Sequence, residues 1–354
     1  MMLGDLGATV IKVERPINGD DTRGWGPPFN EDGEAAYFLS VNRNKYSLAA
    51  DLSKPDDQRL LLELIAGADV VVENFLPGVL ARYGLDADSL LAKNPRLIWA
   101  TISGFGPTSR RPGYDFVAQA ESGWMAITGE PDGDPMKAGV ALVDVLAGKD
   151  ASIGILAALA ARGDGASLSP AQRRIHVALA TSAVSALVNV AQNVLVTGQD
   201  ATRWGNAHAN LVPYQLFHAQ DRPFVIAVGA DSQWIAMTRA LDLDELAADD
   251  ALRTNAGRLA QRERVVTAIS KQVTTRSAAH WMQRLDAVGV PCGVVNSVQD
   301  ALATVTASAH TGVQPLWNGT ITVGPPKLDE HGVTIRENQW NFARNVPIPR
   351  RDSV

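Results

Sequence analysis

Short apolar runs alternate with segments of helical periodicity through the first half of the chain, and this alternation limits the fold more than any other feature. The runs at residues 10–14, 47–52, 68–75 and 96–106 have the length and composition of strands, while the segment 57–68 repeats its apolar residues at helical spacing. Turn residues and helical patterns follow the strands, as in βαβ units. We therefore predict an α/β fold built around a mostly parallel sheet.

The second half has a different organisation, which predicts a smaller second domain. Helical patterns at 151–162 and 177–195 precede a long polar and aromatic segment, 197–215, that is typical of a connector. Beyond it, FVIAVGADSQW predicts a strand entering a glycine turn, 235–289 is mostly helical, and CGVVN follows. A length of 354 residues is enough for roughly two domains. We place a large domain at 1–196 and a small domain at 216–300, joined by the connector 197–215.

Loops at the carboxyl ends of parallel strands are the usual place for a ligand. In this chain those loops contain ERPINGDD, ENFLPG and SGFGPTSRRPGYD, and neither GxGxxG nor GxxxxGK[ST] is present. Asn74 and Phe75, directly after a strand, offer a hydrogen bond and a flat apolar wall, or are simply turn and core residues. The candidates for phosphate contacts are single cations, each more often a solvated surface residue when taken alone: Lys12, Arg15, Lys45 and Arg82.

One carboxylate, Asp144, interrupts the apolar stretch VALVDVLAG at residues 140–148. Asp is a favoured N-cap residue, so one interpretation is that Asp144 begins the helix that follows. The other is that it reacts, because an ionised and partly desolvated carboxylate suits nucleophilic catalysis through a mixed anhydride. The two interpretations are compatible, since a helix N-terminus favours the ionised form.

Charge and composition limit the partners. The net charge of −6, with scattered basic residues, argues against nucleic acid binding. Cys292 is the only cysteine, and the six histidines show no metal-ligand spacing, so we expect neither a disulfide nor a metal site. The sequence has no apolar run of about 18 residues and no signal-peptide layout, which predicts a cytoplasmic protein without a membrane partner.

Several motifs in a fixed order resemble class III CoA-transferases, the family of formyl-CoA transferase and carnitine CoA-transferase. They are LGDLGATVIKVERPINGDDTRGWGPPF, SVNRNKYSLAADL, VVVENFLPGVLARYGL, ISGFGPTSRRPGYDFVAQAESG, and Asp144 followed by Gly148. The resemblance runs from residue 3 to about 300. It implies a Rossmann-like large domain, a smaller α/β domain, an interlocked homodimer, and a segment 301–354 that returns toward the large domain. It also identifies Asp144 as the catalytic aspartate.

The activity that this resemblance implies needs CoA thioesters as substrates and no permanently bound cofactor. Asp144 would form an aspartyl anhydride and then an aspartyl-CoA thioester. The glycine turn Gly229, Ala230 and Asp231 would supply or gate oxyanion donors, or is only a tight turn. The positions that match the family's CoA contacts are Arg15, Lys45, Asn74, Phe75, Arg82 and Phe105; Ser103 stands where some relatives have a lysine.

The resemblance also bears on the substrate. A sister branch racemises 2-methylacyl-CoA with a histidine in a GHD motif, whereas this chain has Gly113-Tyr114-Asp115, and tyrosine, with an ordinary pKa of about 10, is a poor general base. The segment RWGNAHANLVPYQLF resembles the branch that acts on dicarboxylic acids, such as succinyl-CoA with glutarate. Arg203, His208 and Tyr114 are the candidates for binding the acceptor acid; alternatively, Arg203 and His208 only fix the connector against the partner subunit.

Three departures from the family pattern support another hypothesis. The sequence opens with MMLGDLG, which predicts the end of a helix closed by Gly7, without the strand and glycine turn that precede it in relatives and contribute to the CoA site. GDGASLSPAQRR replaces a TGxGQ motif, and the C-terminal PPLLGEH-type motif is missing. A catalytically impaired acyl-CoA-binding homologue is therefore the alternative to an active transferase.

Overall fold

A computed structural model describes residues 1–165, 167–304 and 323–345, and it has a mixed α/β fold. Internal contacts divide the chain into two units. Unit 1 contains Met1–Ser122, Gly139–Val188 and the described residues 323–345, and unit 2 contains Gly123–Ala138 and Asn189–Thr304. The domain boundaries inferred from the sequence stay predictions.

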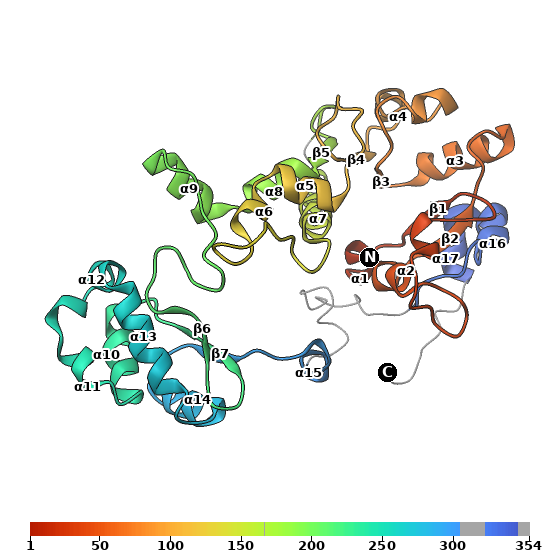
Figure 1. Cartoon of the computed structure of the whole chain (residues 1–354). Coiled ribbons are helices and arrows are strands. Elements are labelled where there is room, and N and C mark those ends of the chain that lie inside the picture. The colour runs from red at the N-terminus through yellow and green to blue at the C-terminus, as the bar shows by residue number, and fades with distance from the viewer. Residues whose placement is uncertain (166, 305–322, 346–354) are drawn as a thin grey trace. The chain divides into compact units, whose positions relative to one another are not determined.

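The strands of unit 1 form two parallel sheets (Figure 1). β1 (Ile11–Glu14) pairs with β2 (Tyr46–Ala49), and β3 (Val70–Glu73), β4 (Ile98–Ser103) and β5 (Arg174–Ala178) form a three-stranded sheet in that order. Glu73 is in register with Thr101, and Thr101 with His176, so the carboxyl ends of the three strands share one edge. The predicted α/β fold with parallel strands is confirmed.

Some helices of unit 1 begin or end at recognisable local sequence signals. α3 begins at Pro55 and α4 is capped by Asp86, whose side chain accepts the N–H of Ser89. Gly7, just after α1, has a φ of 100°, as expected for a residue that closes a helix. The helical segments before residue 189 in this unit are α1 (Met2–Asp5), η1 (Asp21–Gly24), α2 (Ala36–Val41), α3 (Pro55–Gly67), η2 (Leu80–Tyr83), α4 (Ala87–Lys93), α5 (Asp115–Glu121), α7 (Leu142–Gly163) and α8 (Leu179–Ser185).

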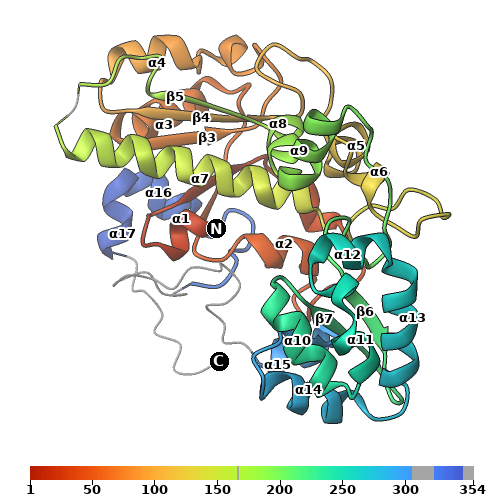
Figure 2. The ribbon, with the colours of Figure 1, turned by 90° about the vertical axis from the view of Figure 1, so that its left-hand side faces the viewer.

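Helix α7 runs alongside the three-stranded sheet (Figure 2). The two pack closely at Gly154, where an added Cβ would lie 3.0 Å from the Ile175 side chain on β5. On β4, Trp99 is buried in a cluster with Leu90, Leu91 and Leu97, and these residues attach α4 to the sheet. This packing holds the middle of α7 against β5 and attaches α4 to the sheet.

The C-terminal helices α16 (Gly332–Asn338) and α17 (Phe342–Asn345), with η5 (Gln339–Asn341) between them, lie beside β1 and β2 (Figure 1). Asp329 accepts the N–H of Ala49 at 2.7 Å. The Trp340 indole N–H donates to the carbonyl of Leu64 at 2.7 Å, and Phe342 is fully buried. These contacts add part of the chain's C-terminal region to the core of unit 1.

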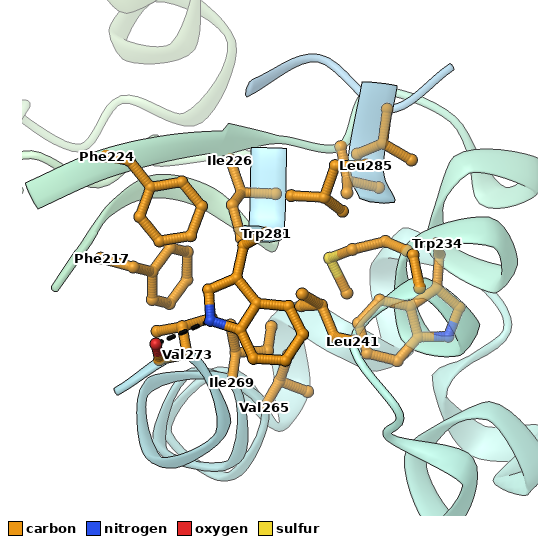
Figure 3. Close-up of a cluster of buried hydrophobic side chains, with 14 of the residues drawn as sticks. Phe217, Phe224, Ile226, Trp234, Leu241, Val265, Ile269, Val273, Trp281 and Leu285 are labelled. Atoms are coloured by element: carbon orange, nitrogen blue, oxygen red, sulfur yellow. Dashed lines mark hydrogen bonds between the residues drawn. The ribbon is translucent and has the colours of Figure 1, made fainter. Parts of the chain in front are cut away.

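Unit 2 has a three-stranded antiparallel sheet in the order β6 (Tyr214–His218), β7 (Pro223–Ala227), β8 (Cys292–Val294). Phe217, Phe224 and Ile226 from the sheet pack against Trp234 and Trp281 from the helices, and the Trp281 indole N–H donates to the carbonyl of Val273 (Figure 3). Its helical segments are α6 (Trp124–Ile127), α9 (Val188–Thr197), α10 (Asp231–Ala240), α11 (Asp244–Ala248), η3 (Asp250–Leu252), α12 (Asn255–Ala260), α13 (Arg262–Val273), α14 (Ala278–Asp286) and α15 (Val298–Ala303); Val188, the first residue of α9, belongs to unit 1.

The helical pattern predicted over 177–195 is wrong at its start and in its continuity. Residues 177–178 end β5, because pairing with β4 satisfies their backbone groups, and the helix is interrupted between α8 and α9, where Val188 has a φ of 44°. The strand β6 is not among the predicted strands: its first two residues lie in the predicted connector 197–215, and no strand is predicted over 216–218. In the described part of the chain no single helix is long and apolar enough to cross a membrane; α8 and α9 together have the length and composition, but are bent by 73°.

Candidate active site

Asp144 lies in the first turn of α7, three residues after the N-cap residue Ala141. The interpretation of Asp144 as the N-cap is therefore wrong. Its side chain is exposed, and within the described ranges its carboxylate accepts no hydrogen bond and forms no ion pair. A carboxylate in this position is available to react with a bound substrate.

The cap of α7 is supplied by Asp115, the first residue of α5. Its Oδ1 accepts the N–H of Val143 at 2.7 Å, and its Oδ2 accepts the side-chain amide of Gln119 at 2.6 Å. Asp115 is only 9% exposed. The sequence showed Asp115 in the GYD motif, but gave no signal that it would bond to a residue 28 positions further along the chain.

The environment of Asp144 makes it more basic than an ordinary aspartate. Burial raises the pKa of its carboxyl to about 6, and the negative charge of Asp115 adds to this effect. Although Asp144 is exposed in the single chain, neighbouring protein atoms still displace part of its hydration. At pH 7 the group remains mainly ionised, because the pH is above its pKa.

Tyr37 on α2 lies close enough to Asp144 and Asp115 for their charges to affect its hydroxyl. Burial raises the pKa of its hydroxyl, and the charges of Asp144 and Asp115 raise it further. The phenol therefore keeps its proton near neutral pH and can donate a hydrogen bond. The ring of Trp25 meets that of Tyr37 edge-on, with centroids 5.0 Å apart. Neither aromatic residue belongs to a site that the sequence predicts.

Three of the predicted CoA contacts meet at the carboxyl edge of the three-stranded sheet. Asn74 and Phe75 directly follow β3, and Phe105 follows the neighbouring strand β4. The Arg111 guanidinium lies over the Phe105 ring, 4.1 Å from its centroid, and adds a cation that was not predicted.

Two glycines hold the loop that carries Phe105. A Cβ added to Gly113 would lie 2.2 Å from the Cα of Gly104, so the loop after β4 and the start of α5 touch backbone to backbone. Only glycine at both positions permits this approach. The contact places the GYD motif next to the carboxyl end of β4.

The predicted phosphate contacts are not gathered in one place. Arg15 follows β1 and Lys45 precedes β2, so in this parallel pair they lie at opposite strand ends. Arg15 pairs with Asp21, whereas the Lys45 ammonium donates to Asn42 at 2.9 Å. Burial, with the charge of Lys12 next, lowers the pKa of Lys45 to about 8. Arg82 is exposed in η2.

A cavity of about 250 Å³ opens at the carboxyl ends of β4 and β5. Its walls include Ser103, His176 and Asp150, and the Asp150 carboxylate accepts the hydroxyl of Ser182 at 2.6 Å. Within the described ranges no group of three or more His, Cys, Asp or Glu could hold a metal ion. Burial, followed by the nearby Asp286, raises the pKa of Cys292 to about 11, so this thiol is a poor nucleophile.

The predicted gating turn precedes α10 in unit 2 and is tied down by two side chains. The amide oxygen of Gln233 accepts the N–H of Gly229 at 2.9 Å and that of Ala230 at 3.1 Å. Asp231 pairs at 2.9 Å with Arg258, which is itself buried. The two backbone donors expected for an oxyanion are thus occupied in this structure, and the gating role stays a prediction.

The three residues predicted to bind the acceptor acid fall in both units. Tyr114 is exposed at the N-cap position of α5 in unit 1. In unit 2 the Arg203 guanidinium donates to the carbonyls of Gly133 at 2.7 Å and Glu130 at 3.1 Å, and His208 accepts the N–H of Asn210 through Nδ1. Arg203 therefore attaches the connector to a loop of its own chain. The binding roles stay predictions.

Comparison with known proteins gives the family. The profile of CoA-transferase family III matches residues 1–350. The mouse succinyl-CoA:glutarate CoA-transferase is 40% identical over 353 residues, which are 99% of this chain and 79% of the relative. The succinate–glutarate CoA-transferase of Agrobacterium fabrum is 42% identical over 317 residues, 87% of this chain and 78% of the relative.

A solved structure similar to this chain supports the same family assignment. The crystal structure of a CAIB/BAIF family protein from Brucella suis is 38% identical and superposes with a TM-score of 0.78, covering 95% of this chain and 93% of that one. Its likeness extends over the mixed α/β fold and the parallel sheets. By sequence and by fold, the chain belongs to CoA-transferase family III.

Proposed function

We propose that this enzyme transfers CoA from succinyl-CoA to a dicarboxylic acid, with Asp144 as the nucleophile. The observation that carries the proposal is a carboxylate without a partner in the described chain, at the first turn of α7, with its pKa raised to about 6. The names of the relatives support the substrates, since the protein of Haloarcula hispanica, 37% identical, is a succinyl-CoA:mesaconate CoA-transferase.

In the first half-reaction, an Asp144 oxygen attacks the thioester carbonyl of the donor, the C–S bond breaks, and CoA leaves as a thiolate. The product is a mixed anhydride between Asp144 and the acyl group. The thiolate then attacks the aspartyl carbonyl of this anhydride. Succinate leaves as a carboxylate, and Asp144 becomes a CoA thioester.

The second half-reaction runs the same steps in reverse order. The acceptor carboxylate attacks the aspartyl thioester and expels the CoA thiolate, which forms a second anhydride. The thiolate attacks the acceptor's acyl carbon, the new thioester leaves, and Asp144 is restored as a carboxylate. No net proton transfer is required, because carboxylates and thiolates are the only nucleophiles and leaving groups.

Asn74, Phe75 and Phe105 would border CoA, because the sheet brings these three residues to one edge. Arg15, Lys45 and Arg82 would meet its phosphates. Gly229, Ala230 and Asp231 would supply or gate the oxyanion donors, and in that role Gln233 has to release the two N–H groups that it binds.

Tyr114 and His208 are proposed to receive the distal carboxylate of the acceptor. For Arg203 the bonds to backbone carbonyls favour the alternative role of holding the connector. The alternative activity, racemisation, would require a second acid or base opposite Asp144, and the GYD motif places Tyr114 where the racemase branch has histidine.

We further propose that the large domain is Rossmann-like, that the smaller domain is α/β, and that two chains form an interlocked homodimer. Helix α9 supports the dimer, because it buries none of its residues in the single chain although its composition is largely apolar. Leu195 is 77% and Val196 75% exposed. Apolar surface of this kind is usually covered by a partner.

The test is peptide mass spectrometry after incubation with succinyl-CoA, with hydroxylamine or borohydride added to trap activated carboxyls. We expect modification on the peptide that contains Asp144, and none there in Asp144→Asn. Asp164→Asn is the matched control, since Asp164 is an exposed carboxylate at the C-cap of the same helix. Protein that binds CoA but stays unmodified would contradict the transferase mechanism; exchange of the α-proton would then indicate a racemase, and no turnover a non-catalytic acyl-CoA-binding protein.

A further inference from the structure

We propose that Asp115 is a positioning residue for Asp144: its carboxylate holds the first turn of α7 and keeps a fixed negative charge beside the reacting group. This inference rests on the proposed transferase function. Asp115 itself need not touch the substrate.

The first turn of α7 has no side-chain cap of its own. The N-cap residue is Ala141, which has no acceptor. The N–H of Val143 points to Asp115 at 2.7 Å, and Val143 is fully buried, at 0% exposure. Because water cannot easily replace a partner at a buried N–H, the Asp115 carboxylate is the group that satisfies it.

Asp115 is held in its turn by Gln119, one turn further along α5. The Gln119 amide donates to Asp115 at 2.6 Å and also reaches the carbonyl of Val140 at 3.5 Å. Gln119 is fully buried. Through these bonds α5 holds Val140 and Val143, which lie on either side of Ala141. Asp144, the residue proposed to react, follows directly.

The loop before α5 is fixed as well. Gly113 touches Gly104 backbone to backbone, which anchors this loop to the loop that follows β4. A continuous set of contacts therefore runs from the carboxyl end of β4 through Gly113 and Asp115 to Val143. Asp144 follows Val143 directly, so its position depends on this set.

The charges around Asp144 make Asp115 the dominant ionic influence. Asp115 from α5 and the Tyr37 hydroxyl from α2 are the titratable groups that face it. Helix α8 and strand β4 carry no titratable residues. The other charged or titratable groups on the elements packed against α7 have partners elsewhere: Asp5 pairs with Arg43, Arg174 with Asp88, Glu121 with Arg111, and His176 interacts with Glu73. On α7 itself, Asp150 binds Ser182, and Lys149 is five residues beyond Asp144.

The two carboxylates have unequal surroundings. The Asp115 carboxylate accepts two N–H groups, whereas the Asp144 carboxylate accepts none in the described chain. The negative charge of Asp115 makes Asp144 more basic and a better nucleophile once ionised. Removal of this charge should move the pH dependence of Asp144 chemistry to lower pH.

Two variants separate the charge from the hydrogen bond. Asp115→Asn keeps an acceptor oxygen for Val143 and removes the charge, and the Gln119 amide has to turn over so that its oxygen accepts the new N–H. Asp115→Ala removes both the acceptor and the charge. Glu121→Gln is the control, because Glu121 is an exposed carboxylate on the same helix, paired with Arg111. The readouts are the rate at which succinyl-CoA labels Asp144 between pH 4.5 and 8, and a carbon-13 titration of the Asp144 carboxyl, assigned by difference from Asp144→Asn.

We expect the acidic midpoint of Asp115→Asn to fall by at least about half a pH unit, with the KM for succinyl-CoA unchanged and thermal stability retained. Asp115→Ala should slow labelling by about 10-fold or more, because the first turn of α7 is displaced. Glu121→Gln should behave as wild type. Profiles and titrations of Asp115→Asn that overlay those of wild type would overturn the inference. Failure of wild-type protein to label at Asp144 would instead overturn the proposed function, and the titration would still decide the role of Asp115.

Discussion

At the scale of single residues, the reactivity proposed for Asp144 follows from the absence of groups that would stabilise its charge. No N–H group in the described chain bonds to it, part of its hydration is displaced, and a second carboxylate lies nearby. Each of these conditions disfavours the charged form. Keeping Asp144 ionised therefore lowers the free energy of unfolding, which is common for reactive groups.

Neutralising this residue should stabilise the fold. The folded-state pKa of Asp144 is raised from its ordinary value to about 6, so the folded protein binds this proton more tightly than the unfolded chain, and stability falls as the pH rises from about 4 to 6. Asp144→Asn should therefore be more stable than wild type at pH 7, and the difference should vanish at pH 4. Thermal unfolding of both proteins across this range measures it. An Asp144→Asn protein that is less stable at pH 7 would contradict the assignment of an unsatisfied carboxylate.

Gly113 is the second residue-scale case. A Cβ at this position meets the Gly104 backbone at 2.2 Å, which neither loop can relieve by rotating a side chain. We expect Gly113→Ala to destabilise the protein by roughly 1–3 kcal/mol and to slow labelling of Asp144. Gly163→Ala, at the open end of α7, is the control and should be neutral or slightly stabilising, since nothing lies within 4 Å of its Cβ.

At the scale of elements, polar side chains that bridge segments matter as much as apolar packing. In unit 2 the Arg258 guanidinium, 1% exposed, donates to the carbonyl of Val212 at 2.7 Å and of Leu252 at 3.0 Å, and pairs with Asp231. It joins the residues just before β6, the η3 segment and the start of α10. In unit 1 Asp115 plays the same part between α5 and α7.

Loss of Arg258 should be costly for this reason. Arg258→Met leaves buried carbonyls without donors, and we expect unit 2 to lose about 3 kcal/mol or more of its unfolding free energy. Urea unfolding followed by tryptophan fluorescence is a suitable probe, because Trp234 lies 5.1 Å from the guanidinium carbon. Arg253→Met is the control: its ion pair with Asp250 is exposed and should contribute less than about 1 kcal/mol. Equal losses in the two variants would contradict the bridging role.

At the scale of the whole molecule, the proposed dimer can be tested through α9. We expect light scattering to give a mass of twice the 37.7 kDa of the chain. Leu195→Asp with Val196→Asp should weaken the dimer, since charges would be buried in its interface, whereas Val333→Asp, at an exposed position of α16, should not. A monomeric wild-type protein that is active would rule out the dimer as a requirement for the site.

Local sequence determined the alternation of strands and helices, the parallel sheets, and the choice of Asp144 as the reactive candidate. These follow from periodicity and residue type within short windows, together with motifs that hold their order along the chain. The continuity of residues 177–195 as helix was misjudged, because pairing of β5 with β4 outweighs the helical pattern at 177–178. The sequence also suggested that Asp144 is the N-cap of α7, which is wrong, because the N-cap residue is Ala141.

Only the tertiary structure decided which groups surround Asp144. Asp115 is separated from Val143 by 28 positions, and Arg258 from Val212 by 46, so neither bond leaves a pattern in a local window. Capping, desolvation and the influence of one charge on another depend on distances in space, which packing sets. The sequence alone therefore identified the residue proposed to react, whereas folding determined its pKa and the contacts that hold it in place.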